Sequence, residues 1–343
     1  MRKLLNTLFV LTPESYLALE GENILILMEE KELGRFPLHT LEMVLYFGYK
    51  GASPALMGGC AKRGVGLCFF TPNGRFLARV TGEDRGNVLL RKAQYRLSDD
   101  PSASCRTARN FILGKLYNSR WSLERATRDH PLQVDVPALK EASAALAGLC
   151  RDVSLCDSLE SLRGLEGAAA TLYFGVLDQL ILREKESFFF RERSRRPPLD
   201  RFNALLSFAY TLLANDCAAA LEGVGLDAYV GFLHRDRPGR TSLALDLMEE
   251  LRVPMADRFV LSLINNRTIQ GGHFRCQESG AVLLTDEARR QLLSAWQQRK
   301  REVITHPFLE EKIPWGLAPH IQALLLARYL RGDLEEYPPF FWK

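Results

Sequence analysis

Residues 229–250 read YVGFLHRDRPGRTSLALDLMEE, and they join an apolar run, a basic turn and an acidic helix. The apolar run ends at His234. The turn contains proline and glycine and leads to Ser242, a residue type that favours the start of a helix. A histidine and carboxylates that a turn brings together suit a divalent metal ion. The stretch therefore predicts part of a metal site.

The helix after the turn carries three carboxylates. Asp246, Glu249 and Glu250 are spaced i, i+3 and i+4, so they share one face, and the opposite face is apolar. Such an acidic stripe is commonly the solvated side of an amphipathic helix. A lone histidine such as His234 is also often a core residue. At this point both interpretations stay open.

A third candidate for the metal site is Glu166, which is followed by one glycine and three alanines. Small residues leave room for another helix or a ligand to approach closely. A charged side chain beside a tightly packed helix start is costly unless it is paired or bound to a cation. The alternative is a glutamate that the helix dipole favours near an N-terminus. Neither interpretation is preferred from these residues alone.

Composition limits the possible classes. The 343 residues are 47% hydrophobic and 25% charged, which indicates a globular protein long enough for two domains. A net charge of +4 is too small for a uniformly basic nucleic-acid protein. Seven cysteines without a CxxC pair argue against disulfides and structural zinc and predict a cytoplasmic protein. No apolar run reaches the ~18–20 residues of a membrane span.

The predicted fold class is α+β, with a small β-rich domain at residues 1–85 and a larger all-α domain at 86–343. In the first part we expect an initial strand, two strands around a turn at 21–23, a helix from Pro54 to about Arg63, and paired strands at 65–70 and 76–80. Helical spacing begins near residue 87. Loops are predicted at 98–104, Gly164, 197–198 and 235–240, and a small hairpin within 271–284.

Positive charge is concentrated in two stretches. Residues 106–128 hold six Lys/Arg against one acid, and residues 191–201 hold five Arg against two acids. Aromatic residues lie among or next to them, which suits a phosphate backbone with exposed bases. A solvated helix face explains the same pattern.

Three stretches together resemble one known family. They are residues 165–173 (LEGAAATLY), 203–213 (NALLSFAYTLL), and 225–234 followed by 242–252. In this order and spacing they resemble the CRISPR-associated adaptation integrase, the universal first Cas protein, which is a metal-dependent DNA endonuclease that inserts new spacers. Residues 338–343 (PPFFWK) resemble its type I-C branch. The resemblance covers essentially the whole chain.

The resemblance implies roles for four residues. Glu166 matches the first metal ligand, His234 the second and Glu249 the third, with Mn²⁺ or Mg²⁺ as the cofactor. Asp246 matches an acidic position that supports the site or the chemistry. Glu250 is then expected to be only part of the solvated face. All four matched residues are expected to be catalytic.

The implied reaction is strand transfer, in which a 3′-hydroxyl of a short duplex attacks a phosphodiester of the CRISPR repeat. The implied partners are DNA (the protospacer duplex and the repeat), a second copy of the chain bound through the β-rich domain, and the small second Cas protein. One alternative is a general metal-dependent nuclease of DNA repair without integration. Another is a non-enzymatic DNA-binding scaffold. The DNA-contact candidates are Arg106, Arg109, Lys115, Arg120, Arg191, Arg193, Arg195 and Arg196.

Overall fold

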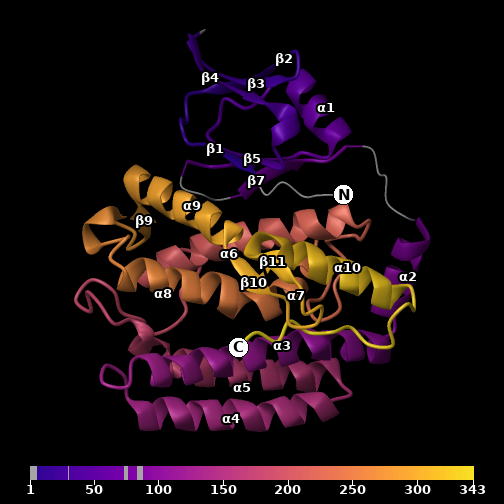
Figure 1. The fold of residues 1–343 in the computed structure, drawn as a ribbon, viewed down its shortest axis with the longest axis vertical. Coiled ribbons are helices and arrows are strands. Elements are labelled where there is room, and N and C mark those ends of the chain that lie inside the picture. Colours follow the sequence, from indigo (N-terminus) through magenta and orange to yellow (C-terminus); the bar gives the residue numbers. More distant parts are fainter. Residues whose placement is uncertain (1–5, 30, 73–75, 83–87) are drawn as a thin grey trace. The chain divides into compact units, whose positions relative to one another are not determined.

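The computed structural model describes residues 6–29, 31–72, 76–82 and 88–343. The chain divides into two compact units. The first comprises residues 1–85 and 293–301, and the second residues 86–292 and 302–343. The boundary predicted near residue 85 lies outside the described residues. The α+β fold class is confirmed: the N-terminal part is rich in strands and the rest is mainly helical (Figure 1).

The N-terminal part of the first unit contains two sheets and helix α1 (Figure 1), and residues 293–301 of this unit are part of helix α9, Asp286–Arg301. In the four-stranded sheet of order β1-β5-β6-β7, the first two pairings are parallel and the last is antiparallel. The strands β2-β3-β4 form a separate antiparallel sheet. The bounds are β1 Thr7–Val10, β2 Tyr16–Glu20, β3 Asn23–Met28, β4 Lys31–Pro37, β5 Met43–Phe47, α1 Pro54–Arg63, β6 Gly66–Phe70 and β7 Phe76–Val80, with a short 3₁₀ turn at Leu38–Thr40.

Several local predictions for this unit are confirmed. The turn at residues 21–23 joins β2 and β3, and β7 pairs back onto β6. Helix α1 begins at Pro54 because the Ser53 hydroxyl accepts the Leu56 N–H, and it ends at Gly64, whose φ of +69° is left-handed. Strand β5 was not predicted. It lies between β1 and β6, and α1 provides the crossover between the parallel strands β5 and β6.

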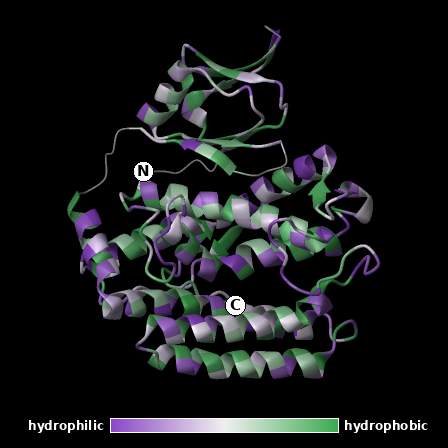
Figure 2. Ribbon diagram, turned by 180° about the vertical axis from the view of Figure 1, so that it is seen from behind, coloured by the Kyte–Doolittle hydropathy of each residue, from purple (hydrophilic) through white to green (hydrophobic). Residues whose placement is uncertain are grey.

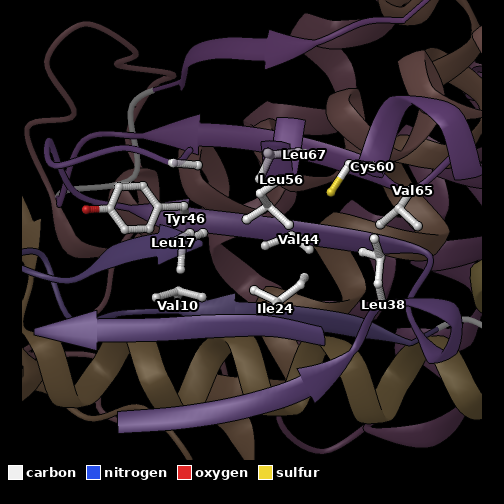
Figure 3. Close-up of a cluster of buried hydrophobic side chains, with 11 residues drawn as sticks. Val10, Leu17, Ile24, Leu38, Val44, Tyr46, Leu56, Cys60, Val65 and Leu67 are labelled. Carbon is white, nitrogen blue, oxygen red and sulfur yellow. The ribbon is translucent and has the colours of Figure 1, made fainter. Parts of the chain in front are cut away.

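The core of the first unit lies between the sheets and α1. Figure 3 shows the buried cluster, which draws on strands, on α1 and on the 3₁₀ turn. Leu17, Ile24 and Val44 are completely buried in it. The Tyr46 hydroxyl is also buried and donates to the Ser15 carbonyl at 2.6 Å, so its polar end is satisfied. This unit brings none of the predicted catalytic residues, which all belong to the second unit.

The second unit is built from helices around a long α3 (Figure 1). Helix α3 packs against α4 and α5 on one side and also contacts α7. In Figure 2, α3, α4 and α5 carry hydrophobic and hydrophilic residues interspersed along their lengths, as expected for helices that bury one side. The bounds are α2 Val88–Asp99, α3 Pro101–Asp129, α4 Val136–Leu155, α5 Leu159–Leu177, α6 Arg201–Gly223, α7 Ser242–Leu251, α8 Arg258–Asn265, α9 Asp286–Arg301 and α10 Ala318–Leu330, of which α9 belongs to this unit only up to residue 292.

The remaining elements of this unit are short. The hairpin predicted within 271–284 is confirmed as β8 (Phe274–Cys276) and β9 (Val282–Leu284). A second hairpin, β10 (Val303–Thr305) with β11 (Lys312–Pro314), was not predicted. Short 3₁₀ turns lie at Asp178–Leu180, Gly271–His273 and Trp315–Leu317, and a π-helical turn follows α7 at Arg252–Asp257.

Two predicted loops differ from the structure. The loop at 98–104 is reduced to Asp100, whose carboxylate caps α3 by accepting the N–H groups of Ser102 and Ala103 at 2.8 and 3.2 Å. The prediction of a loop at Gly164 is wrong, because Gly164 lies inside α5. A glycine costs about 1 kcal/mol in a helix interior, which the packing of α5 against α3 and α4 offsets.

Helix α6 is long and apolar. By length and composition alone it could cross a membrane, but 67% of its apolar window is buried inside the protein. It packs against α7, α10 and the π-helical turn. It is therefore a core helix that supports α7.

Candidate metal centre

Four elements bring the candidate residues together in the second unit. Glu166 is on α5, Asp246 and Glu249 are on α7, and His234 is in the loop before α7. Lys115 is on α3, which packs against both α5 and α7. The packing of α3 thus joins α5 and α7, which are far apart in the sequence.

Asp246 organises the loop that carries His234. Its carboxylate is completely buried and accepts four hydrogen bonds. The N–H groups of Phe232 and Leu233 donate to Oδ2 at 2.6 and 3.0 Å. The His234 N–H and the ring Nδ1 lie 3.0 and 2.6 Å from Oδ1. These contacts occupy both oxygens of Asp246, which makes it a positioning residue for His234.

The contact with Asp246 determines which nitrogen of His234 can bind a metal. An ionised carboxylate only accepts hydrogen bonds, so Nδ1 carries the proton and Nε2 is left as the ligand atom. Burial disfavours the imidazolium, but the hydrogen bond to Asp246 and the charges of Asp246 and Glu249 outweigh it, so the pKa of His234 is raised. The same carboxylates therefore make the ring a better ligand and a stronger base.

Glu166 and Glu249 share one cation, the ammonium of Lys115. Lys115 Nζ donates to Glu166 Oε1 and lies 2.8 Å from Glu249 Oε2. Arg252 donates to the other oxygen of Glu249 at 2.6 Å. Burial alone would raise the pKa of Glu249, but Arg252, Lys115 and His234 lower it to about 2. Glu249 is thus ionised at neutral pH although it is buried.

The chemistry of these residues fits a divalent metal ion. Among the described residues no three His, Cys, Asp or Glu side chains form a ready-made metal cage. However, a cation already lies between Glu166 and Glu249, and Glu249 Oε2 accepts no well-directed hydrogen bond although Lys115 Nζ is close. Two carboxylates and an imidazole nitrogen suit Mn²⁺ or Mg²⁺. Glu166, His234 and Glu249 are therefore the residues that could hold the ion.

Glu250 is not on a solvated face, so that prediction is wrong. It is completely buried and bonds the Tyr337 hydroxyl, Gln322 Nε2 at 3.0 Å and the Phe340 N–H at 2.7 Å. Burial raises the pKa of Glu250 to about 7, and these hydrogen bonds oppose the rise. Residues 337–342 and α10 cover the face that the sequence pattern predicted to be wet. The helix has two buried sides, one facing the candidate metal centre and one facing the C-terminal segment.

The π-helical turn after α7 helps to hold Arg252 in place, through contacts other than that with Glu249. Pro254 lies in this turn and has no N–H to donate, which is compatible with an irregular helix. The Arg252 guanidinium lies 4.9 Å from the Tyr210 ring centroid, and the Tyr210 hydroxyl donates to Asp257 at 2.6 Å. Burial raises the pKa of Asp257 to about 6 against the effect of these partners. The network fixes Arg252 and, through it, Glu249.

A cavity of about 550 Å³ adjoins His234. It is lined by residues near the start of α3, by residues near the start of α5, and by the loop 231–236. Arg163 is among them and holds this loop by donating to the Leu233 carbonyl at 2.7 and 3.1 Å. Of the three candidate metal ligands only His234 lines the cavity, which therefore leaves room for a ligand on the His234 side of the centre.

The predicted DNA-contact residues separate into three groups. Arg106, Arg191, Arg195 and Arg196 are exposed, and Arg109 and Arg120 are partly buried. Two candidates are not surface charges. Lys115 is 7% exposed and paired with the two carboxylates, and Arg193 donates to Asn203 Oδ1 and the Ser207 hydroxyl at 2.6 and 3.0 Å. Lys115 and Arg193 are therefore held by other protein groups and are not exposed to contact the backbone of DNA, which corrects that prediction for these two residues.

Sequence reasoning missed the part that four residues play in shaping the site, although it had named one of them, Lys115, as a DNA contact. Arg163 holds the His234 loop, Arg252 pairs with Glu249, and Lys115 bridges the two carboxylates. A Cβ on Gly231 would lie 2.9 Å from Asp246 Oδ2 and 2.9 Å from Ser242 Cβ, so the close approach of the loop to α7 requires glycine. Two signals were available: a single lysine within the apolar run 111–117, and an arginine three residues after Glu249.

Comparison with known proteins gives the family. The model of the family described as CRISPR associated protein Cas1 matches residues 8–298. The chain is 51% identical over 343 residues to CRISPR-associated endonuclease Cas1 1 of Chlorobaculum tepidum, with both chains fully covered. It is 52% identical over 347 residues to CRISPR-associated endonuclease Cas1 2 of Rhodospirillum rubrum, again with both fully covered.

Solved structures share the fold at lower identity. A casposase bound to an integration product has a TM-score of 0.83 at 21% identity, covering 98% of this chain and 94% of the casposase. A Cas1 protein from Thermotoga maritima has a TM-score of 0.82 at 21% identity, covering 95% and 97%. Together with the match to the family model and the identity to the curated relatives, this leads to one conclusion: the chain belongs to the Cas1 family of CRISPR-associated proteins.

Proposed function

We propose that this protein is a metal-dependent DNA endonuclease and integrase that inserts new spacer DNA into a CRISPR array. The observation that carries the proposal is the site itself. Glu166 and Glu249 face one shared cation, and the Nδ1 contact to Asp246 leaves Nε2 of His234 as a ligand. The curated relatives at about half identity are named endonucleases, and the similarly folded casposase is bound to an integration product.

In the proposed mechanism, Glu166, His234 Nε2 and Glu249 would hold a Mn²⁺ or Mg²⁺ ion. Such an ion, when bound, would supply positive charge to polarise a phosphoryl oxygen and lower the pKa of the attacking hydroxyl. Asp246 keeps His234 oriented through the ring and the loop N–H groups. Arg252 keeps Glu249 ionised and in place. Because Asp246 is buried and already accepts four hydrogen bonds, its proposed role is positioning rather than proton transfer.

The DNA would be held mainly through its phosphates, because a spacer can have any sequence. Arg106, Arg191, Arg195 and Arg196 are the exposed candidates for these contacts, and Arg109 and Arg120 are partly buried ones. Neutralising an exposed candidate should weaken binding about equally on unrelated DNA sequences and make the salt dependence less steep. The cavity beside His234 would admit the strand that reacts.

The proposed assembly is a homodimer formed through the β-rich first unit, in complex with DNA and the small second Cas protein. A chain of a solved Cas6-RT-Cas1–Cas2 complex shares the fold of this protein with a TM-score of 0.81 at 23% identity. The cytoplasmic location and the type I-C branch remain predictions from the sequence.

A strand-transfer assay tests the function. A short labelled duplex is incubated with a repeat-containing plasmid and the protein in Mn²⁺, Mg²⁺ or chelator. We expect joined products with either metal, none with chelator, and a loss of about 100-fold or more in Glu166→Gln, since a ligand to a catalytic charge is lost. Glu141→Gln, an exposed glutamate on α4, is the matched control and should join normally.

The products separate the proposed reaction from its alternatives. Shortened strands without joined products would indicate a nuclease that does not integrate. Equal joining by wild type and Glu166→Gln would refute the site assignment. DNA binding without any metal-dependent cleavage or joining would support the non-enzymatic scaffold.

A further inference from the structure

We propose that Lys115 is a built-in cation that competes with the divalent metal for Glu166 and Glu249 and so keeps metal binding weak until DNA is present. This inference rests on the proposed function, because it concerns the same metal centre. It assigns Lys115 a role in positioning and ion selection, in place of the surface contact with DNA that the sequence suggested.

The position of Lys115 is that of a bridging cation. Its ammonium contacts one oxygen of Glu166 and one of Glu249, which come from different helices. Among the described residues, Lys115 is the only ion-pair partner within 4 Å of Glu166. Glu249 has a second partner, Arg252, on its other oxygen. The ammonium therefore lies where two of the three proposed ligands converge.

The charge balance makes Lys115 a competitor of the metal. Glu166 and Glu249 face two cations, Lys115 and Arg252, so these two ligands are already balanced before any metal binds, and the buried Asp246 beside His234 adds one further carboxylate. The Lys115 side chain is 9% exposed and that of Glu249 is 4% exposed, so water screens these charges poorly. Adding a divalent ion with Lys115 in place would leave an excess of positive charge at close range. The ion must displace the ammonium, or a phosphate must bring negative charge to balance it.

Displacement would use the flexibility of the Lys115 side chain. Lysine carries its charge on a flexible four-carbon stem, unlike the planar, bidentate arginine. The void of about 10 Å³ beside Lys115 is no larger than one water, so the ammonium would leave by rotation of this stem and not by entering a ready cavity. Arg252, in contrast, is held by Glu249 and the Tyr210 ring. Of the two cations, Lys115 is thus the one that a metal ion would displace from the carboxylates. A DNA phosphate is the anion that would stabilise its ammonium after displacement.

The test measures metal binding rather than activity. Mn²⁺ is titrated calorimetrically into metal-free protein without DNA. We expect Lys115→Met to bind Mn²⁺ about tenfold more tightly than wild type or better, because a buried competing charge is removed. Lys140→Met removes an exposed lysine paired with Glu124 and should match wild type. Adding a short DNA duplex should strengthen Mn²⁺ binding by wild type and reduce its difference from Lys115→Met.

A second measurement keeps the proposal testable if Lys115→Met folds poorly without metal. Protein refolded and purified with Mn²⁺ is then titrated with a chelator, and the release of Mn²⁺ is followed by electron paramagnetic resonance. Lys115→Met and Lys115→Gln should both retain Mn²⁺ at higher chelator concentrations than wild type. Lys115→Arg, which keeps the charge, should not. The gain should disappear in Lys115→Met combined with Glu166→Gln.

The outcomes distinguish this inference from the proposed function. If His234→Ala binds Mn²⁺ as tightly as wild type, the metal centre itself is misassigned. If Mn²⁺ binding depends on His234 but the neutral variants bind no tighter than wild type, the competing role of Lys115 is refuted and the proposed metal centre stands. Weaker binding in the neutral variants would show that Lys115 supports the site instead of competing for it.

Discussion

Replacing Asp246 with asparagine removes one charge and keeps the size of the side chain. Two pairs of donors converge on the carboxylate, one pair at each oxygen. An asparagine has a single oxygen, so its NH₂ faces either the two loop N–H donors or the His234 pair. In the second orientation the His234 ring can change tautomer so that Nδ1 accepts, and only the His234 N–H loses its partner. Hydrogen bonds to charged groups contribute about 1.5–3 kcal/mol each, so losing one or two lowers the free energy of unfolding by about 1.5–6 kcal/mol.

Urea unfolding of the metal-free protein measures this loss. Asp227→Asn is the matched control. Asp227 is only partly buried and accepts one hydrogen bond at each oxygen, from the Tyr95 hydroxyl and the Tyr229 N–H, so its replacement should change stability by about 1 kcal/mol or less. Strand joining should fall in Asp246→Asn even under conditions where the variant is folded, because His234 loses its fixed orientation. A stability within about 0.5 kcal/mol of wild type, together with normal joining, would refute the positioning role of Asp246.

Three further predictions concern other parts of the second unit. The pKa of Glu250 is raised from 4.5 to about 7, so the protonated side chain stabilises the fold fully below about pH 4.5, and this contribution is lost as the pH rises through 7. The free energy of unfolding of Glu250→Gln, measured between these pH values, should therefore depend less on pH than that of wild type, by up to about 3 kcal/mol. Arg193→Ala should lower stability by about 2 kcal/mol in thermal unfolding, whereas Arg196→Ala should leave stability unchanged and weaken DNA binding in a salt titration; the reverse pattern would contradict the assignment. Gly231→Ala should cost about 1–3 kcal/mol by urea unfolding and reduce joining, because the new methyl overlaps α7; unchanged values for both would argue against the close contact.

Local chemistry explains which parts of the fold were predictable. The helix starting at Pro54 and the β2–β3 and β8–β9 hairpins depend on residues adjacent in sequence, such as the Ser53 cap. Strand β5 was missed because its burial on both faces gives no alternation. Gly164 was misjudged because the packing of α5 overrides a weak local preference.

The candidate site shows a similar division. Residues 165–173 and 225–252 resemble the family's motifs, which pointed to Glu166, His234 and Glu249, and the structure brings these residues to one region. Whether the neighbouring charged residues Glu250 and Lys115 are buried or exposed was not predictable in this way. Glu250 is solvated or buried according to whether residues 337–342 cover it, and Lys115 faces solvent or the carboxylates according to which side of α3 meets α5 and α7. Both depend on contacts between segments far apart in the chain.

The bond from Phe340 to Glu250 also has a consequence for biosynthesis, because it spans 90 positions. At roughly 5–20 residues per second, a ribosome that has made Glu250 needs on the order of ten seconds more to make its partner. During that interval α7 has been synthesised, but the Glu250 carboxylate is not yet covered. The neighbouring Glu249 lies on a helix that is not yet fully packed. The packing around α7 is therefore completed only after translation reaches the C-terminal segment, so a nascent or truncated chain leaves the Glu250 side of the candidate metal centre uncovered.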